Sequence, residues 1–218
     1  MAGALYAIDR VLRLLSPRLG LFVYDFMVQP IADKPLLPPN LVKNLQFRPI
    51  VRGDPEVALM PAREDVKASR FDQGATCLGA WRKDKLIGYL WLCRPVYQED
   101  EVRCTYVLAD SERSVFDFDL YILPEHRLGL GFAAVWHGAN EHLRSQGIRY
   151  TFSRLTRFNV ASRRSHDHLG WKRVGQAVIL RAGPVELMGA TIAPFFHLTW
   201  TAGRRATLTL RPDVLEHH

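Results

Sequence analysis

The sequence has few cysteines, and nothing in their spacing ties them together. Among its 218 residues there are three, Cys77, Cys93 and Cys104. They form no C-x-x-C pair and no His/Cys cluster at zinc-binding spacing. An odd number of scattered thiols argues against a disulfide framework and against a zinc site. We therefore expect no metal centre and a reducing compartment, the cytoplasm.

Long uninterrupted hydrophobic runs are also missing. Arg10 and Arg13 break the apolar start of the chain, and Asp25 breaks the apolar run over 19–28. Neither run reaches the roughly 18 apolar residues that a membrane helix needs, and neither has the layout of a signal peptide. The sequence thus predicts a soluble protein that is not secreted.

Acidic residues are outnumbered by basic ones. The chain has 29 Lys and Arg against 22 Asp and Glu, a net charge of +7. Residues 215–218 (LEHH) resemble a cloning remnant and are set aside, which raises the net charge by one. A basic chain favours anionic partners such as phosphates, nucleic acid or an anionic membrane. Charge alone does not choose among them, and we expect no specific nucleic-acid partner.

Residues 1–45 form an N-terminal extension in this interpretation. Apolar residues recur at helical spacing over 2–16, which predicts an amphipathic helix that ends at Pro17. The prolines between 30 and 39 then predict a linker without regular structure. Two roles stay open for the helix: packing on the core, or contact of residues 1–28 with a membrane surface or partner. The arginines and the aromatic segment Phe22, Tyr24 and Phe26 favour contact.

From residue 46 onward, strand patterns alternate with helical ones. We predict an α/β (α+β) core over 46–182, C-terminal strands over 183–214 that complete its sheet, and the remnant 215–218. The expected strands are 46–51, 76–81, 86–93, 102–108, 114–123, 148–155 and 172–181; the expected helical segments are 54–60 with 63–71, 132–145 and 159–168. Two further apolar runs, 195–201 and 206–210, flank Gly203-Arg204-Arg205 and predict a closing hairpin.

The strand over 114–123 carries two carboxylates. In SVFDFDLYIL, apolar residues alternate with Asp117, Asp119 and Tyr121. Because successive side chains of a strand point to opposite faces, we expect one apolar face and one face that holds both carboxylates. A carboxylate on such a face is a candidate general base, although solvation or an ion pair with arginine explains it equally well.

A glycine-containing turn follows this strand and leads into a helix. Gly129 and Gly131 leave room for an anion to approach the backbone, and Arg127 adds positive charge. Backbone N–H groups at such a turn and helix N-terminus bind phosphates, but such turns also arise for steric reasons alone. The third glycine of a dinucleotide-binding motif is missing, and so is the Gly-Lys-Ser/Thr of a P-loop.

A second motif lies one helix and one strand downstream. It begins at Asn159, continues through Ser162 and His166, and ends at Gly170-Trp171. Together the two motifs resemble the GNAT superfamily of acyl-CoA N-acyltransferases. The close resemblance covers residues 114–175, and 46–113 agree only in the order of elements. It implies a mixed, mostly antiparallel sheet flanked by helices, here with an N-terminal helical extension.

The resemblance also implies a site for acetyl-CoA (CoA). Backbone groups of the strand near Tyr121, Ile122 and Leu123 would hold the pantetheine and polarise the thioester carbonyl. The pyrophosphate would lie on the loop formed by Arg127, Leu128, Gly129, Leu130, Gly131 and Phe132. From the second motif, Asn159 would lie along the pantetheine arm, and Ser162 would also bind the cofactor. Two positions depart from the family pattern: His126 stands where Gln or Arg is usual, and His166 where many members have a tyrosine that protonates the departing thiolate.

The resemblance implies direct attack of an amine on the thioester in a ternary complex. Asp119 and Asp117 are then candidate bases, and His166 is a candidate acid because imidazole titrates near neutral pH. The histidine would equally serve packing alone. The expected acceptor is the primary amine of a small molecule, an amino sugar or a lipid-linked compound.

Two other functions stay open at this point. One is a non-catalytic acyl-CoA-binding sensor or assembly module, supported by the missing tyrosine. The other is binding of nucleic acid or an anionic membrane through the basic surface, which would weaken steeply with salt. A homodimer is also expected, because dimers are common among the proteins that this chain resembles.

Overall fold

The structure is a computed structural model that describes residues 10, 11, 14, 16, 18–159 and 169–216. The N-terminal helix expected over 2–16 and the helix expected over 159–168 lie almost entirely outside the described residues. The described part divides into two compact units. Unit 1 comprises Met1–Gln29, Val96–Asp110 and Phe152–His218, and unit 2 comprises Pro30–Pro95 and Ser111–Thr151.

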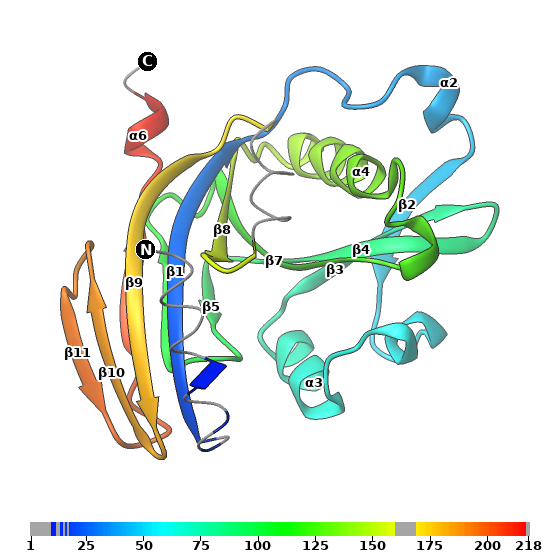
Figure 1. Ribbon diagram of the computed structural model, residues 1–218. Coiled ribbons are helices and arrows are strands. Elements are labelled where there is room, and N and C mark those ends of the chain that lie inside the picture. The colour runs from blue at the N-terminus through cyan, green and yellow to red at the C-terminus, as the bar shows by residue number, and fades with distance from the viewer. Residues whose placement is uncertain (1–9, 12–13, 15, 17, 160–168, 217–218) are drawn as a thin grey trace. The chain divides into compact units, whose positions relative to one another are not determined.

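Unit 2 contains a four-stranded antiparallel arrangement with helices on both faces (Figure 1). Its strands lie in the order β7-β4-β3-β2. Their bounds are β2 (Leu45–Ile50), β3 (Thr76–Arg82), β4 (Lys85–Cys93) and β7 (Ser114–Ile122), and the helical segments are α2 (Pro39–Val42), η1 (Pro55–Leu59), α3 (Glu64–Asp72), η2 (Pro124–His126) and α4 (Gly131–Ser145). α4 lies on one face of these strands and α3 on the other.

Burial of aromatic side chains explains the packing of unit 2. Trp81 and Trp91 on the strands and Trp136 on α4 are each at most 2% exposed. On the α3 side, the rings of Phe71 and Trp91 meet edge to face, with centroids 4.9 Å apart. Each fully buried aromatic side chain contributes about 1.5–3 kcal/mol through the apolar area removed from water. Burial of these rings holds the two helices against the strands.

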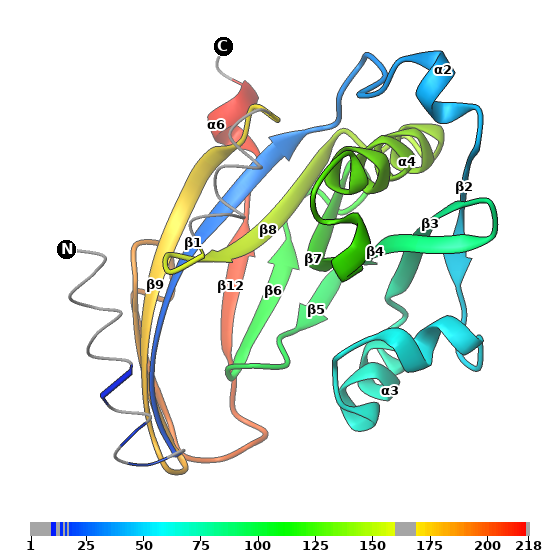
Figure 2. The same cartoon turned by 45° about the vertical axis from the view of Figure 1, so that its right-hand side comes forward.

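Unit 1 contains strands of two sheets (Figure 2). Its strands of the first lie in the order β11-β10-β9-β1-β8, and those of the second lie in the order β12-β6-β5. Their bounds are β1 (Leu19–Pro30), β5 (Val96–Gln98), β6 (Cys104–Leu108), β8 (Tyr150–Thr156), β9 (Lys172–Ala182), β10 (Val185–Ala190), β11 (Phe196–Thr199) and β12 (Ala206–Leu210), followed by the short helix α6 (Asp213–Glu216). The rings of Phe26 on β1 and Tyr106 on β6 join the two sheets, with centroids 5.4 Å apart.

The strand pairs confirm the expected fold class. The pairs of known register in the two main strand groups are all antiparallel, whereas β12 pairs parallel with β6. The result is a mixed, sheet-dominated α+β fold with few helices. The hairpin expected around residues 82–85 is present as β3 and β4, and the strand, loop and helix expected over 114–145 are present as β7, η2 and α4.

Two parts of the sequence-based interpretation are wrong in this structure. The extension over 1–45 was expected to hold only a helix and a linker, but 19–30 form β1, paired along its length with β9 from Leu19 opposite Ala182 to Val28 opposite Lys172. The closing hairpin does not form: β11 pairs with β10, and β12 pairs with β6. β1 is buried over ten consecutive residues, so it lacks the alternation that marks a half-exposed strand.

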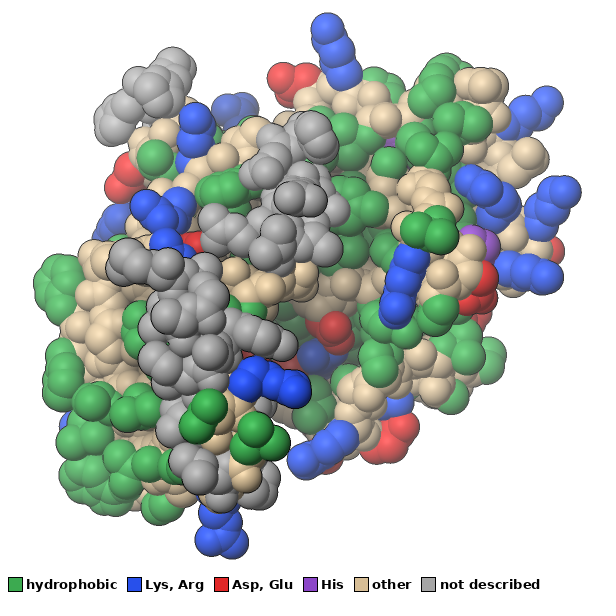
Figure 3. All heavy atoms as spheres, in the orientation of Figure 1, with side chains coloured by type: hydrophobic (Ala, Val, Ile, Leu, Met, Phe, Trp, Pro, Cys, Tyr) green, Lys and Arg blue, Asp and Glu red, His purple; other side chains and the backbone are tan. Residues whose placement is uncertain are grey.

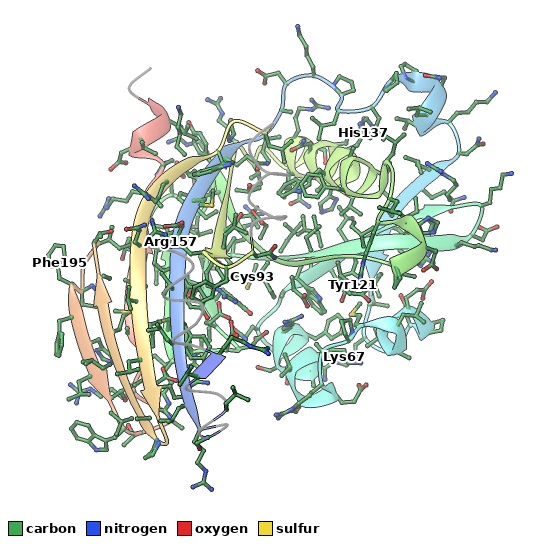
Figure 4. All side chains as sticks on the ribbon, viewed as in Figure 1. Lys67, Cys93, Tyr121, His137, Arg157 and Phe195 are labelled. Atoms are coloured by element: carbon green, nitrogen blue, oxygen red, sulfur yellow. The ribbon has the colours of Figure 1, made fainter. Side chains whose placement is uncertain are left out.

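The outer face of β9, β10 and β11 is apolar. Leu180, Leu187 and Leu198 are cross-strand neighbours and are each between 36% and 43% exposed. Phe195 and Phe196 are 68% and 65% exposed beside them. Figure 3 shows hydrophobic side chains gathered on this side of the molecule, and Figure 4 shows Phe195 pointing away from the strands. The face therefore carries exposed apolar side chains on three neighbouring strands.

Candidate active site

A bulge interrupts β7 at the two carboxylates. Tyr121 lies opposite Tyr89, but Phe118 lies opposite Trp91, so Asp119 and Leu120 together face the single residue Leu90. Asp119 accommodates the extra residue of the bulge by adopting a left-handed backbone conformation, with φ +48°. A bulge of this kind bends the strand and redirects side chains. The regular alternation expected over 114–123 therefore ends at Asp119.

The bulge places Asp119 against an arginine of α3. The Arg70 guanidinium forms an ion pair with the Asp119 carboxylate and also lies 5.3 Å from the centre of the Phe118 ring. The neighbouring residues 118 and 119 thus both contact Arg70, which a regular strand does not allow. Of the two interpretations of Asp119, the structure shows the ion pair with arginine.

Asp117 occupies a different environment. It lies opposite Leu92 on β4 and is only 4% exposed. The two carboxylates therefore differ in environment, because Asp117 is buried and Asp119 forms an ion pair with arginine. Whether either accepts a proton during a reaction stays a prediction.

The end of β7 offers one backbone donor on the side away from β4. The Leu123 N–H donates to the Ile87 carbonyl at 2.9 Å, so it is not a free donor for a ligand. In an antiparallel ladder, alternate residues direct their N–H groups to the same neighbour. Tyr121 therefore faces β4 as Leu123 does, and the Ile122 N–H points to the opposite side. Of the three expected residues, Ile122 is therefore the one whose N–H points away from β4.

The loop between β7 and α4 is shaped by its two glycines. Gly129 has φ +145°, and a Cβ there would meet nothing within 4 Å. A Cβ at Gly131 would lie 2.5 Å from the His126 carbonyl oxygen and 2.7 Å from Ile122 Cγ2. Gly129 thus supplies a conformation that other residues rarely adopt, and Gly131 lets the first turn of α4 lie close to the strand end.

The N-terminus of α4 is open to an anion. Among the described residues no side chain caps it, and its first turn contains no acidic residue. The first backbone N–H groups of a helix have no partner within the helix, and together with the helix dipole they attract negative charge. Leu128, in the loop before the helix, is 100% exposed. The expected loop from Arg127 to Phe132 therefore has the geometry of an anion site.

Arg127 folds back over the end of β7. Its Nε donates to the Ile122 carbonyl at 3.0 Å, and its guanidinium lies 5.2 Å from the centre of the Tyr121 ring. Figure 4 shows Tyr121 at this end of the strand. The guanidinium charge is consequently held beside the loop by a hydrogen bond and an aromatic face.

The second motif is only partly described. Ser162 and His166 lie outside the described residues. Asn159 is exposed, and its N–H donates to the Thr156 carbonyl at 3.1 Å, which closes a turn directly after β8.

Asn159 also lines a pocket of about 410 Å³ within unit 1. Leu21, Phe22 and Tyr24 of β1 form one wall, and Glu101 and Phe158 complete it with Asn159. The Tyr24 hydroxyl donates to Glu101 Oε2 at 2.7 Å. This pocket has the size of a small-molecule site.

A buried ion-pair network supports the pocket. Arg154 on β8 donates to Glu101 Oε2 at 3.1 Å and to Glu99 Oε1 at 3.0 Å, and its guanidinium lies 4.2 Å from the centre of the Tyr24 ring. Burial and the nearby carboxylates raise the pKa of Tyr24 above its ordinary value, against the opposite effect of Arg154. The phenol is therefore protonated and acts as a donor.

Sequence reasoning gave no role to Arg70, Glu101 and Arg154, and it assigned Tyr24 to contact with a membrane surface or partner. The acidic run Glu99-Asp100-Glu101 was the one available signal for the pocket. Arg70 gave none, because it is one of many arginines and its partner is 49 residues away.

The described residues contain neither a metal-binding cluster nor a helix that could span a membrane. No group of three or more His, Cys, Asp or Glu side chains there is placed to hold a metal ion. Within the same residues, none of the helices has both the length and the hydropathy to cross a bilayer.

Comparison with known proteins identifies the family. The model of the acetyltransferase (GNAT) family matches residues 45–171, which is more than half of the chain. No curated protein matches the sequence.

Solved structures share the fold. A protein of unknown function from Staphylococcus epidermidis is 12% identical, with a TM-score of 0.56, over 82% of this chain and 67% of that one. A tandem GNAT protein from the clavulanic acid biosynthesis pathway is 15% identical, with a TM-score of 0.50, over 74% of this chain and 53% of that one. This chain thus spans only part of either structure. The match to the family model, on the strand, loop and helix described above, shows that the chain belongs to the acetyltransferase (GNAT) family, a family of acyltransferases.

Proposed function

We propose that the protein transfers an acetyl group from acetyl-CoA to the primary amine of a small molecule. The observation that carries this proposal is the loop before α4. A Cβ at Gly131 would meet the His126 carbonyl oxygen at 2.5 Å, and the helix that starts there has neither a side-chain cap nor an acidic first turn. Such a cradle fits the pyrophosphate of CoA.

Different residues would bind the different parts of acetyl-CoA. The loop from Arg127 to Phe132 would hold the pyrophosphate, and the Ile122 N–H would donate to the pantetheine or the thioester carbonyl. A fixed N–H dipole at that carbonyl stabilises the negative charge that develops on its oxygen. Asn159 and Ser162 would contact the pantetheine arm.

The proposed reaction moves the acetyl group directly from sulfur to nitrogen. Acetyl-CoA supplies an activated thioester. The acceptor arrives as an ammonium ion and loses one proton to a base. Its nitrogen then forms a bond to the acetyl carbon and the carbon–sulfur bond breaks. The nitrogen loses its second proton as the amide forms, the thiolate takes up one proton, and one proton in all is released. Asp119 and Asp117 are the proposed bases, and His166 is the proposed acid.

The proposed acceptor is a small-molecule amine, an amino sugar or a lipid-linked amine, and the proposed location is the cytoplasm. The three cysteines are free and buried, which supports a reducing compartment.

Thermal unfolding with acetyl-CoA, CoA or NADH tests the proposal. A ligand at about 100 times its Kd stabilises the folded state by about 2.7 kcal/mol, which is roughly 5–10 °C in Tm for a chain of this size. We expect this shift with acetyl-CoA and CoA and none with NADH. Free-thiol release with amines then measures turnover.

The outcomes separate the candidate functions. A shift without thiol release from any amine favours a non-catalytic acyl-CoA sensor. Absence of a shift at saturating acetyl-CoA contradicts both and leaves binding of anionic polymers or membranes through the basic surface, which a salt titration measures.

A further inference from the structure

Beside the unit 1 pocket, one arginine forms ion pairs with two carboxylates that differ in exposure. Arg154 contacts both Glu99 and Glu101. The Glu99 side chain is 3% exposed, and that of Glu101 is 46% exposed. One guanidinium thus faces two carboxylates, of which only Glu101 reaches the open side. Glu101 is therefore the carboxylate that lines the open side of the pocket.

Two described arginines beside the pocket, Arg154 and Arg181, already have acidic partners. Arg154 lies against the Tyr24 ring as well as between the two carboxylates. Arg181 lies 4.7 Å from the centre of the Phe22 ring and donates from Nε to Glu186 at 2.8 Å. A carboxylate or phosphate on a ligand would therefore have to compete with Glu99, Glu101 or Glu186 for a guanidinium.

Apart from Thr156 and Asn159, the other residues that line the pocket are apolar or aromatic. Leu21, Phe22 and Phe158 line the pocket, and the ring of Tyr24 lies 6.1 Å from that of Phe22. Aromatic rings favour both an apolar body and a nearby cation, because the ring face is electron-rich. A pocket with one exposed carboxylate and aromatic walls matches a small cation with an apolar body.

We propose that this pocket binds the acceptor, and that the acceptor is a monoamine with an aromatic or aliphatic body and no acidic group. Its ammonium group contacts the Glu101 carboxylate, and its body packs on Phe22 and Phe158. This inference rests on the proposed acyl transfer, since Asn159 in the same wall is assigned there to CoA. It selects among the acceptors named above and disfavours sugar phosphates and amino acids.

Two substrates that differ in one group test the proposed preference for amines without an acidic group. Phenethylamine and phenylalanine share an aromatic body, and only phenylalanine has a carboxylate. At saturating acetyl-CoA we expect kcat/KM to be at least 30-fold higher for phenethylamine. Hexylamine is expected to react as well, and glucosamine 6-phosphate poorly. Equal or better turnover of phenylalanine overturns the proposal.

Substitutions of pocket residues test whether this pocket causes the preference for such amines. Glu101→Gln keeps the shape of the side chain and is expected to raise the KM for phenethylamine at least tenfold. Phe158→Ala is expected to raise the KM for phenethylamine but not for methylamine, which has no body to pack. Glu112→Gln, an exposed carboxylate outside the pocket, is the control and should change neither value. An unchanged KM in Glu101→Gln contradicts the proposal.

The Tm shift with acetyl-CoA separates the two proposals. If the shift is present but neither phenethylamine nor hexylamine is acetylated, the pocket proposal fails and cofactor binding stands. If the shift is absent, acyl transfer fails, and calorimetric titration with phenethylamine decides the pocket alone. Binding to the unaltered protein that is lost in Glu101→Gln supports the pocket, whereas equal binding or none overturns it.

Discussion

The carboxylate of Asp119, at the bulge of β7, forms an ion pair with the guanidinium of Arg70 on α3. The arginine side chain is 8% exposed and the aspartate side chain 30%. Arg70 also lies 5.5 Å from the centre of the Trp91 ring. The pair therefore ties the helix to the strand at the point where the strand departs from regular geometry.

Removal of the Asp119 charge should destabilise unit 2. Asp119→Asn leaves the nearly buried Arg70 without its carboxylate, and we expect a loss of about 1.5–3 kcal/mol in the free energy of unfolding. Urea unfolding of Asp119→Asn, Arg70→Met and the double variant measures the coupling. Additive losses in the double variant would show that the pair contributes nothing.

The same variant separates structure from catalysis. If Asp119 accepts the proton, turnover falls by 10²–10⁴-fold while the Tm shift with acetyl-CoA is retained. A fall of less than threefold would assign Asp119 a structural role only.

The two loop glycines are expected to respond differently to alanine. In Gly131→Ala the new Cβ meets the His126 carbonyl oxygen at 2.5 Å, so the loop must move and CoA affinity should fall at least tenfold. In Gly129→Ala there is space, but φ +145° is strained for alanine. We expect a smaller loss of affinity there. Calorimetry with CoA measures both, and Gly203→Ala, at an open position, is the control.

The cysteines should not react with thiol reagents in the native protein. Cys77, Cys93 and Cys104 are each at most 2% exposed, and burial raises the pKa of Cys93 to about 11 and that of Cys104 to about 12. At pH 8 only a fraction on the order of 10⁻³ of Cys93 would be thiolate, the reactive form. A thiol reagent should therefore label no cysteine in the folded chain and all three in guanidinium chloride. Fast labelling of the native protein would contradict this burial.

Deletion of residues 1–45 should prevent folding of unit 1. The deletion removes β1, which is buried along ten residues and pairs with β9. We expect the shortened chain to be insoluble or to unfold without cooperativity, as circular dichroism and thermal unfolding would show. A chain that ends at Val214 is the control and should fold normally. A cooperative transition in the shortened chain would refute the central role of β1.

Local patterns in the sequence were sufficient to predict many of the strands and helices of unit 2. The hairpin of β3 and β4 has turn residues between two apolar runs, and β7 leads through the glycine loop into α4. Each of these signals depends on residues close together in the chain, where alternation and turn chemistry are informative. The family resemblance depended on the same local segments.

Features that depend on distant contacts could not be predicted in this way. β12 pairs with β6 from Ala206 opposite Cys104, so its apolar run was assigned to the wrong neighbour. The bulge at Asp119 and its partner Arg70 depend on the packing of α3. The pocket joins β1, the segment around Glu101 and the end of β8, which only the folded chain brings together.

The pairing of β1 with β9 has a consequence for synthesis. Leu19 lies opposite Ala182 in the completed sheet, and a ribosome adds about 5–20 residues per second. The nascent chain therefore carries the buried residues of β1 for roughly 10–30 s before their β9 partners are made. During that interval an apolar strand lacks one edge partner, which is the situation that chaperones recognise in growing chains. Expression yield should consequently depend more on translation speed and temperature than the stability of the finished protein suggests.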